Sequence, residues 1–252
     1  MTIAEQIAEQ IADIKYNSNV LYGEGFSDGE AKGTYYGALA EYDRFWDAFQ
    51  DKGNKTYYSH AFRFDGWNEN NLKPKYLIQP THAAYMFSGC GYNGDLTKNV
   101  NLDFSQCEVV SYCFNNMPKV TRIGKVDTSK AGDLSNVFSF CTVLKKIDLL
   151  VLKSNGSQTF TDTFRGCYAL EDISFDDYDS ITGEKGVIGQ NISFYQSTSL
   201  TKASITSIVN ALSSSTSGKT LTLSKTAVNN AFAEAEWDAL EKTKTNWTIS
   251  LV

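Results

Sequence analysis

The chain has 252 residues, of which 42% are hydrophobic, and this is enough apolar sequence for one sizeable core or two. Its formal net charge of −6 and its scattered lysines and arginines argue against nucleic-acid binding. No run approaches the roughly 18 apolar residues of a membrane span, and no basic region precedes an apolar stretch at the N-terminus. We therefore expect neither membrane insertion nor a signal peptide.

The first residues of the chain carry an isoleucine stripe with helical spacing. Ile3, Ile7, Ile11 and Ile14 follow one another at steps of four, four and three residues, with Glu and Gln between them. Isoleucine at successive seam positions favours trimeric or higher coiled coils. We predict that residues 1–37 form a helical attachment segment that joins copies into a homo-oligomer, with a trimer favoured. The alternative is that the stripe packs on the next helix of its own chain.

Residues 38–80 are rich in aromatic side chains. A predicted helix ending near Gly53 places several large apolar residues on one face. They are Leu39, Tyr42, Phe45, Trp46 and Phe49. Such a run can form a carbohydrate-binding platform, but it is more often the core of a small cap. Because a stack of repeats needs an atypical unit over its end, we interpret residues 38–80 as an N-terminal cap.

The register Phe-x-x-Cys-x-x-Leu-x-x-Ile recurs through the middle of the chain. Its core positions are Phe87 and Cys90; Phe114, Met117, Val120 and Ile123; Phe138, Cys141, Leu144 and Ile147; Phe164, Cys167, Leu170 and Ile173; and Phe194 and Leu200. The phenylalanines lie 27, 24, 26 and 30 residues apart, a period typical of leucine-rich repeats. Within each unit the Phe-to-Leu part has the spacing of a short helical turn, and the part after Ile suits a short strand. We therefore predict an α/β fold in which residues 81–203 form a short leucine-rich-repeat solenoid.

Three of the five cysteines share one position of this register. Cys90, Cys141 and Cys167 stand where other copies have Met117 and Ser197. A reduced thiol behaves as a small hydrophobe, and no Cys-x-x-Cys occurs, so we interpret this position as core rather than as a redox or metal site. Cys107 and Cys113 lie outside it, and the sequence leaves their roles open.

Residues 204–252 alternate between helical and strand patterns. Apolar spacing predicts a helix over residues 204–212, a strand over 220–223, a helix over 227–242 and a last strand over 247–251. We interpret this segment as a C-terminal α/β cap.

Several motifs resemble catalytic or phosphate-binding motifs, but the residues around them lack the partners or elements that such sites need. The two histidines, His60 and His82, have no nearby Ser or Cys in a nucleophile setting. Residues 199–202 have the spacing of an acylating serine motif, but Leu200 is a repeat core position. Residues 213–220 imitate a phosphate-binding loop, yet a strand pattern follows instead of a helix. We expect no catalytic residue, no metal and no cofactor.

Two parts of the chain resemble known families. The repeats over roughly residues 83–203 resemble BspA-type leucine-rich repeats, which are right-handed solenoids used as adhesion surfaces. The run Ala-Glu-Tyr-Asp-Arg-Phe-Trp-Asp-Ala-Phe-Gln at residues 40–50, together with the motifs at 58–62 and 66–76, is similar to the start of minor structural proteins of phages and prophages of Gram-positive bacteria. The C-terminal helix, the strand and the closing Trp247 also look like the ends of such proteins.

The resemblance implies a non-enzymatic virion protein of a phage tail, baseplate or fibre, assembled in the bacterial host cytoplasm. Its implied partners are other virion proteins and a host-surface glycan or protein receptor. The alternative is a BspA-type adhesin at the bacterial cell surface. A glycan hydrolase on the same scaffold is disfavoured. Tyr112, Tyr168 and Tyr195 flank core positions and are candidates for exposed aromatic side chains.

Overall fold

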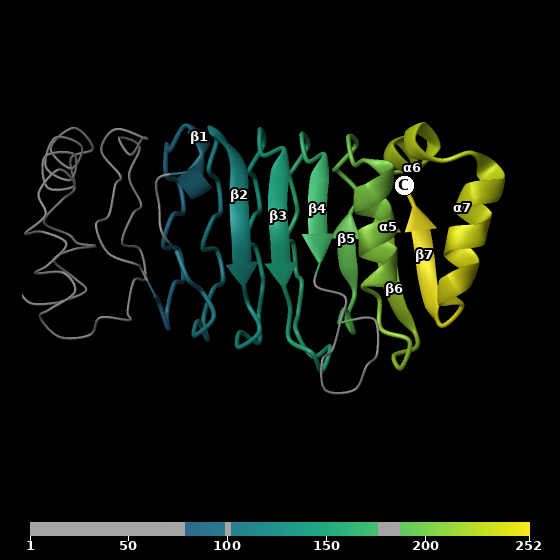
Figure 1. Cartoon of the computed structure of the whole chain (residues 1–252), viewed down its shortest axis with the longest axis horizontal. Coiled ribbons are helices and arrows are strands. Elements are labelled where there is room, and N and C mark those ends of the chain that lie inside the picture. The colour runs from purple at the N-terminus through teal and green to yellow at the C-terminus, as the bar shows by residue number, and fades with distance from the viewer. Residues whose placement is uncertain (1–78, 99–101, 176–186) are drawn as a thin grey trace, which may run out of the picture.

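The computed structural model describes residues 79–98, 102–175 and 187–252, which form a mixed α/β structure with two parallel sheets (Figure 1). The elements in chain order are β1 (Gly94–Asp95), η2 (Leu96–Lys98), β2 (Val120–Asp127), β3 (Lys146–Val151), β4 (Asp172–Phe175), β5 (Ile192–Phe194), α5 (Lys202–Asn210), β6 (Lys219–Leu223), α6 (Lys225–Ala231), α7 (Glu234–Glu241), η3 (Lys242–Lys244) and β7 (Trp247–Leu251). The attachment segment with its isoleucine stripe (Ile3, Ile7, Ile11 and Ile14) and the aromatic segment up to residue 78 lie outside the described residues.

The first sheet places β1, β2, β3 and β4 side by side in sequence order, and every pair is parallel. Ile123 of β2 is aligned with Ile147 of β3, which is aligned with Ile173 of β4. All three isoleucines are buried. The predicted strands at the repeat isoleucines are therefore confirmed, although each begins one to three residues before its isoleucine, and equivalent positions of consecutive units lie next to one another.

The repeat phenylalanines stack on one another in the core. The ring centroids of Phe87, Phe114 and Phe138 lie 5.5 and 5.6 Å apart, with interplanar angles of 6° and 4°. The stack continues to Phe164 at 5.7 Å and to Phe194 at 4.3 Å. All five rings are buried, so each unit covers the apolar ring of its neighbour.

The repeat cysteines are buried as predicted, and the thiols also donate hydrogen bonds. Cys141 Sγ donates to the carbonyl of Phe114 at 2.9 Å, and Cys167 Sγ donates to the carbonyl of Phe138 at 3.1 Å. In the last copy the Ser197 hydroxyl donates to the Cys167 carbonyl at 3.1 Å. At Cys141, Cys167 and Ser197 a small donor thus satisfies a buried carbonyl of the preceding unit, whereas Met117 fills the same position without a donor.

The two cysteines outside the register are also buried and reduced. Cys107 Sγ donates to the Val109 carbonyl at 3.3 Å, and Cys113 directly precedes Phe114 in the chain. Burial raises the pKa of Cys107 to about 12 and raises that of Cys113 well above the ordinary value. Both therefore behave as core residues.

The Phe-x-x-Cys segments are turns, so the predicted short helical turn is wrong. Around Phe138, Asn136 and Phe140 have positive φ angles of 57° and 61°, and Tyr112 and Asn116 flank Phe114 with 59° and 54°. A residue in the left-handed region two positions before and after each phenylalanine interrupts right-handed helix geometry. The same backbone shape repeats in four consecutive units.

These turns bind one another through alternate backbone N–H groups. Leu134 N donates to Thr159 O at 2.9 Å, and Asn136 N donates to Thr161 O at 2.9 Å. The intervening N–H groups bond within their own turn, as Val137 N does to Leu134 O. We name the row of bonds between turns, which runs from Ala83 N–H to the Arg165 carbonyl, the turn ladder. It holds the face opposite the first sheet together across four units.

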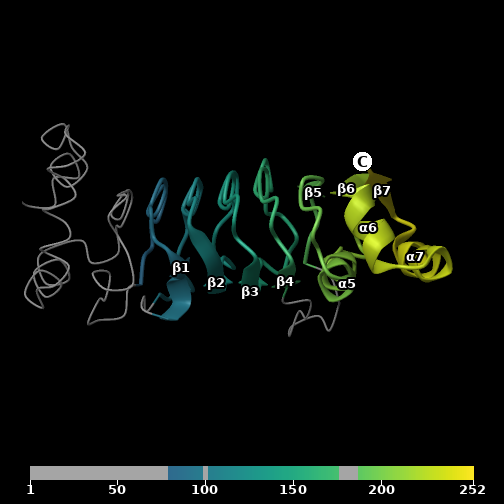
Figure 2. The ribbon, with the colours of Figure 1, turned by 90° about the horizontal axis from the view of Figure 1, so that it is seen from above.

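The second sheet places β5, β6 and β7 side by side in parallel, with α5 leading into β6 and with α6, α7 and η3 leading into β7 (Figures 1 and 2). The predicted helix near 204–212 and the strands at 220–223 and 247–251 are confirmed. The single helix predicted over 227–242 is wrong. It is divided because Phe232 takes an extended conformation (φ −129°, ψ 144°).

Candidate binding groove

The turn ladder stops at the unit that contains Phe164. Counted from the repeat phenylalanine, Phe160 and Asp162 are equivalent to Leu134 and Asn136, whose N–H groups donate to the next unit. Within the described ranges, neither Phe160 N–H nor Asp162 N–H has an acceptor. No backbone hydrogen bond joins the described residues 159–163 to 190–193. The backbones of these two segments are therefore separated.

Close contacts limit this separation at both ends. At one end, a Cβ added to Gly189 would lie 2.4 Å from the carbonyl oxygen of Gly156, so only glycine allows this approach. At the other end, Gly166 N donates to the Gln196 side-chain oxygen at 2.7 Å, one turn beyond the stacked ring of Phe164. The opening is consequently short and closed at each end.

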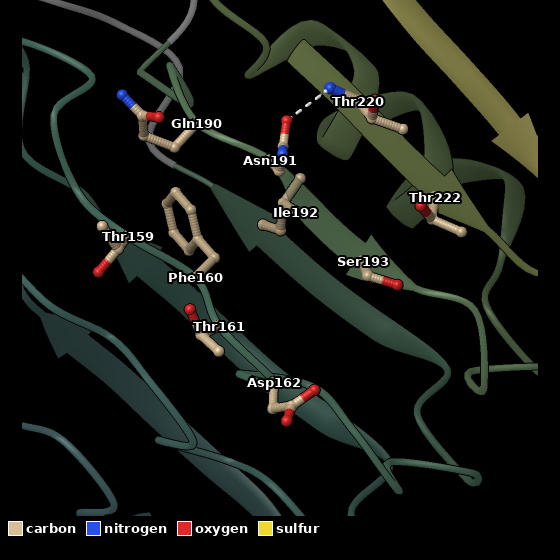
Figure 3. A pocket seen from close by; sticks show the side chains of 10 residues that line it. All are labelled: Thr159, Phe160, Thr161, Asp162, Gln190, Asn191, Ile192, Ser193, Thr220 and Thr222. Carbon is tan, nitrogen blue, oxygen red and sulfur yellow. Dashed lines mark hydrogen bonds between the residues drawn. The ribbon is translucent and has the colours of Figure 1, made fainter.

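The opening is a groove of about 410 Å³, which we name the junction groove because it lies where the turn ladder meets the second sheet (Figure 3). Three segments line it: residues 159–162 of the last turn, β5 with the two residues before it, and the outward-facing threonines of β6. The lining residues are Thr159, Phe160, Thr161, Asp162, Gln190, Asn191, Ile192, Ser193, Thr220 and Thr222. The apolar Phe160 and Ile192 are almost fully buried, and the accessible surface of the groove is polar and apolar in about equal parts.

Hydrogen bonds fix three of the polar side chains of the junction groove. Thr159 Oγ1 donates to Asp133 at 2.6 Å, and the Asn191 side-chain oxygen accepts from Thr220 N at 2.9 Å. The Gln190 side-chain oxygen accepts from Lys219 Nζ at 2.9 Å. These bonds position the amide and hydroxyl groups around the groove before any ligand arrives.

Four hydroxyl groups of the junction groove have no hydrogen-bond partner in the part of the chain that the structure describes. They belong to Thr161, Ser193, Thr220 and Thr222. Each hydroxyl can donate one hydrogen bond and accept two. Together with the two backbone N–H groups, they give the groove an unused set of neutral donors and acceptors.

One carboxylate completes the lining. Asp162 has a φ of 52°, and the only ionic contact of its carboxylate among the described residues is with Arg165 Nη1 at 3.5 Å. Its side chain keeps 46% of its accessible surface, so this pair is weak and solvated. Of the ten lining residues, Asp162 alone carries a charge. The groove is thus suited to holding a polar ligand through hydrogen bonds.

A hydroxyl network supports the groove from the preceding units. Asp133 accepts hydrogen bonds from Ser111, Ser135 and Thr159. Burial opposes ionisation of Asp133, but the hydroxyl bonds from Ser135 and Thr159 are together stronger and hold its pKa below the usual range. The carboxylate therefore ties three successive units together at the rim beside Thr159.

The tyrosines that the sequence suggested lie away from the junction groove. Tyr168 and Tyr195 are exposed, with 49% and 44% of their surface accessible. Tyr112 is half-buried and stacks on Tyr85, with ring centroids 4.6 Å apart. Sequence reasoning missed the groove residues. The Thr-Leu-Thr-Leu alternation at 220–223 was the available signal, because it places both threonines on the face opposite the core.

The chain matches no family model, no curated protein and no solved structure. In the described ranges, no three His, Cys, Asp or Glu side chains gather as ligands for a metal ion. The same ranges contain no helix with the length and apolar character needed to cross a membrane.

Proposed function

We propose that this chain is a non-enzymatic virion protein of a phage tail, baseplate or fibre, built on a BspA-type leucine-rich-repeat solenoid. The observation that carries the proposal is the alignment of equivalent residues in consecutive units. Ile123, Ile147 and Ile173 are in register, and the phenylalanine rings stack without interruption from Phe87 to Phe194. Units that contact mainly their neighbours are the hallmark of a solenoid.

A solenoid suits a binding role because its core residues do not determine its exposed faces. Each unit adds a turn and a strand, and the side chains between core positions form rows that a partner can contact. The junction groove adds a concave site to these rows. Its lining has one carboxylate, Asp162, whereas glycoside hydrolysis generally uses a pair of carboxyl groups. This composition supports binding rather than catalysis.

The assignment to a phage particle rests on the resemblance of residues 40–76 and on the order of the parts. In this proposal the isoleucine stripe at Ile3, Ile7, Ile11 and Ile14 joins three copies, and the repeats extend away from the attachment point. The partners are other virion proteins and a host-surface receptor. A cell-surface adhesin would use the same repeats but would be anchored to the cell wall.

Mass spectrometry of purified phage particles, together with light scattering of the isolated full chain, tests this proposal. We expect the chain among the particle proteins and a mass in solution near three times 28.0 kDa. A chain that is absent from particles and stays monomeric at high concentration would contradict the proposal. Detection in the cell-wall fraction, with neighbouring genes for wall anchoring, would favour the adhesin instead.

A further inference from the structure

We infer that the junction groove binds a short, uncharged saccharide of one or two rings. This inference rests on the proposed function, since it names the ligand class that the protein recognises on its target surface. Three properties of the groove carry it: its limited length, its unused neutral hydrogen-bonding groups and the single charge in its lining.

The shape of the groove excludes a long ligand. Its volume of about 410 Å³ falls in the range of roughly 300–1,000 Å³ typical of small-molecule sites. An extended peptide that adds a strand to a sheet edge must leave the site at both ends. Here the Gly156–Gly189 contact and the bond from Gly166 N to Gln196 close both ends. A compact ligand that enters from the open side fits this outline.

The hydrogen-bonding groups match a ligand rich in hydroxyls. The free hydroxyls of Thr161, Ser193, Thr220 and Thr222 can each donate and accept, as sugar hydroxyls do. The N–H groups of Phe160 and Asp162 need acceptors, and a sugar oxygen can replace the water that otherwise meets them. Asp162 adds a carboxylate that can accept from two neighbouring hydroxyls.

The charge of the lining selects against anionic ligands. The ten lining residues include one carboxylate and no lysine or arginine. A uronic acid or a sugar phosphate would therefore bring its negative charge towards Asp162, and the two adjacent cations are already engaged, Arg165 with Asp162 and Lys219 with Gln190. A neutral sugar avoids this repulsion and keeps the carboxylate as an acceptor.

The site is preorganised on regular elements. Ser193 lies on β5 and Thr222 on β6, which are paired in the same sheet. Asn191 is fixed to Thr220 N, and Thr159 is fixed to Asp133. Polar groups that are already held in place lose less conformational entropy when a ligand binds. The groove can therefore bind a small ligand without first ordering its walls.

The test is a screen of the full chain against an array of neutral mono- and disaccharides, with glucuronic acid, sialic acid and glucose 6-phosphate as charged probes. Titration calorimetry then gives the affinity for the best neutral probe. We expect at least one neutral saccharide to bind, with a Kd of roughly 1 mM or tighter, and the charged probes to bind at least tenfold more weakly.

Two variants locate the binding. In the first, Thr161→Val, Ser193→Ala and Thr222→Val remove three groove hydroxyls, and we expect affinity to fall at least tenfold. In the second, Thr161→Trp fills the groove from an exposed position and should abolish binding. Thr248→Val is the matched control, since Thr248 lies beside Thr220 on β7 but outside the groove lining. Circular dichroism confirms that each variant is folded.

The inference is overturned if no neutral saccharide binds, or if the best one binds the triple variant within twofold of the unchanged chain. Preferential binding of a charged probe also overturns it. These results leave the proposed function separately testable, because the presence of the chain in virions does not depend on the groove. Absence from virions with intact saccharide binding would contradict the virion assignment alone.

Discussion

The two sheets of this molecule are both parallel, yet their strands are connected in different ways. In the first sheet, β2, β3 and β4 are joined through tight turns that hydrogen-bond to one another across units. In the second sheet, helices α5, α6 and α7 occupy the connections (Figure 2). A turn presents backbone groups to the next unit, whereas a helix satisfies its backbone internally. The turn ladder ends where the part of the chain that forms the second sheet begins, and the junction groove lies at that boundary.

The two regions also differ in what fills their cores. Stacked phenylalanines and donating thiols fill the first region, with the Phe138 ring at the centre of the stack. The second region buries the apolar faces of its helices, including Ile205, Ile208 and Val209 of α5. Substitutions in one region at a time therefore test whether each region is held together by the contacts described here.

The largest effect is expected from Phe138→Ala. This ring contacts one phenylalanine on each side, and its loss leaves a cavity in a fully buried stack. We expect a loss of about 3–5 kcal/mol in the free energy of unfolding, measured by urea denaturation. Tyr168→Ala serves as the control, since its ring is 49% exposed and its removal should change stability by less than about 0.5 kcal/mol. Similar losses for both variants would refute the role of the stack.

Gly189→Ala tests the contact that closes one end of the junction groove. The new Cβ would lie 2.4 Å from the Gly156 carbonyl oxygen, which is backbone and cannot rotate away. We expect a destabilisation of about 1–3 kcal/mol, measured by thermal and urea denaturation. Gly132→Ala is the control because its Cβ would meet nothing within 4 Å, and it should be neutral or stabilising by up to about 1 kcal/mol. Unchanged stability of Gly189→Ala would show that the backbones at Gly156 and Gly189 are not in contact.

The buried thiols predict alkaline sensitivity of the first region. Burial raises the pKa of Cys141 to about 12, so the unfolded chain loses this proton near pH 9 while the folded chain keeps it. The contribution of this thiol to the free energy of unfolding is therefore fully present below pH 9. It falls as pH rises towards 12, by at most about 1.4 kcal/mol per pH unit. Urea denaturation between pH 8 and 11 should show a shallower decline for Cys141→Ala than for the unchanged chain. Parallel declines would contradict the assignment.

The smallest effect is expected from Asp133→Asn, which weakens the hydroxyl network at the rim of the groove. The pKa of Asp133 is lowered in the folded chain. Its contribution to the free energy of unfolding is therefore present above the pKa that this carboxyl has in the unfolded chain, and is lost as pH falls through its pKa in the folded chain. The variant should be less stable at pH 7 by about 1 kcal/mol or less, and the difference should vanish near pH 3. A difference that persists at pH 3 would mean that the carboxylate charge is not involved.

Periodicity was sufficient to predict the strands and the core. The repeat phenylalanines and isoleucines recur at a fixed offset, so their burial and alignment follow from the pattern alone. The alternation at residues 220–223 and 247–251 predicted β6 and β7 in the same way. The helix break was not predictable because Phe232 has no helix-breaking side chain. It is extended because its ring packs on Trp237 and under Lys202.

The junction groove could not be predicted, because it depends on hydrogen bonds that are missing. The Thr159 and Thr161 carbonyls still take part in the turn ladder, because they accept from Leu134 N and Asn136 N of the preceding unit. Only the tertiary structure reveals that the N–H groups of Phe160 and Asp162 face a separated segment. The turns were mispredicted for a related reason, since left-handed residues such as Phe140 leave no mark in apolar spacing.

Amide hydrogen exchange of the native chain, followed by NMR, tests most directly the claim that the turn ladder ends at the junction groove. Leu134 N and Asn136 N donate to the next unit and should be strongly protected. The equivalent amides of Phe160 and Asp162, which have no acceptor in the described ranges, should exchange at least about a hundredfold faster. Equal protection of the two pairs would show that the ladder continues across the junction and would contradict the account.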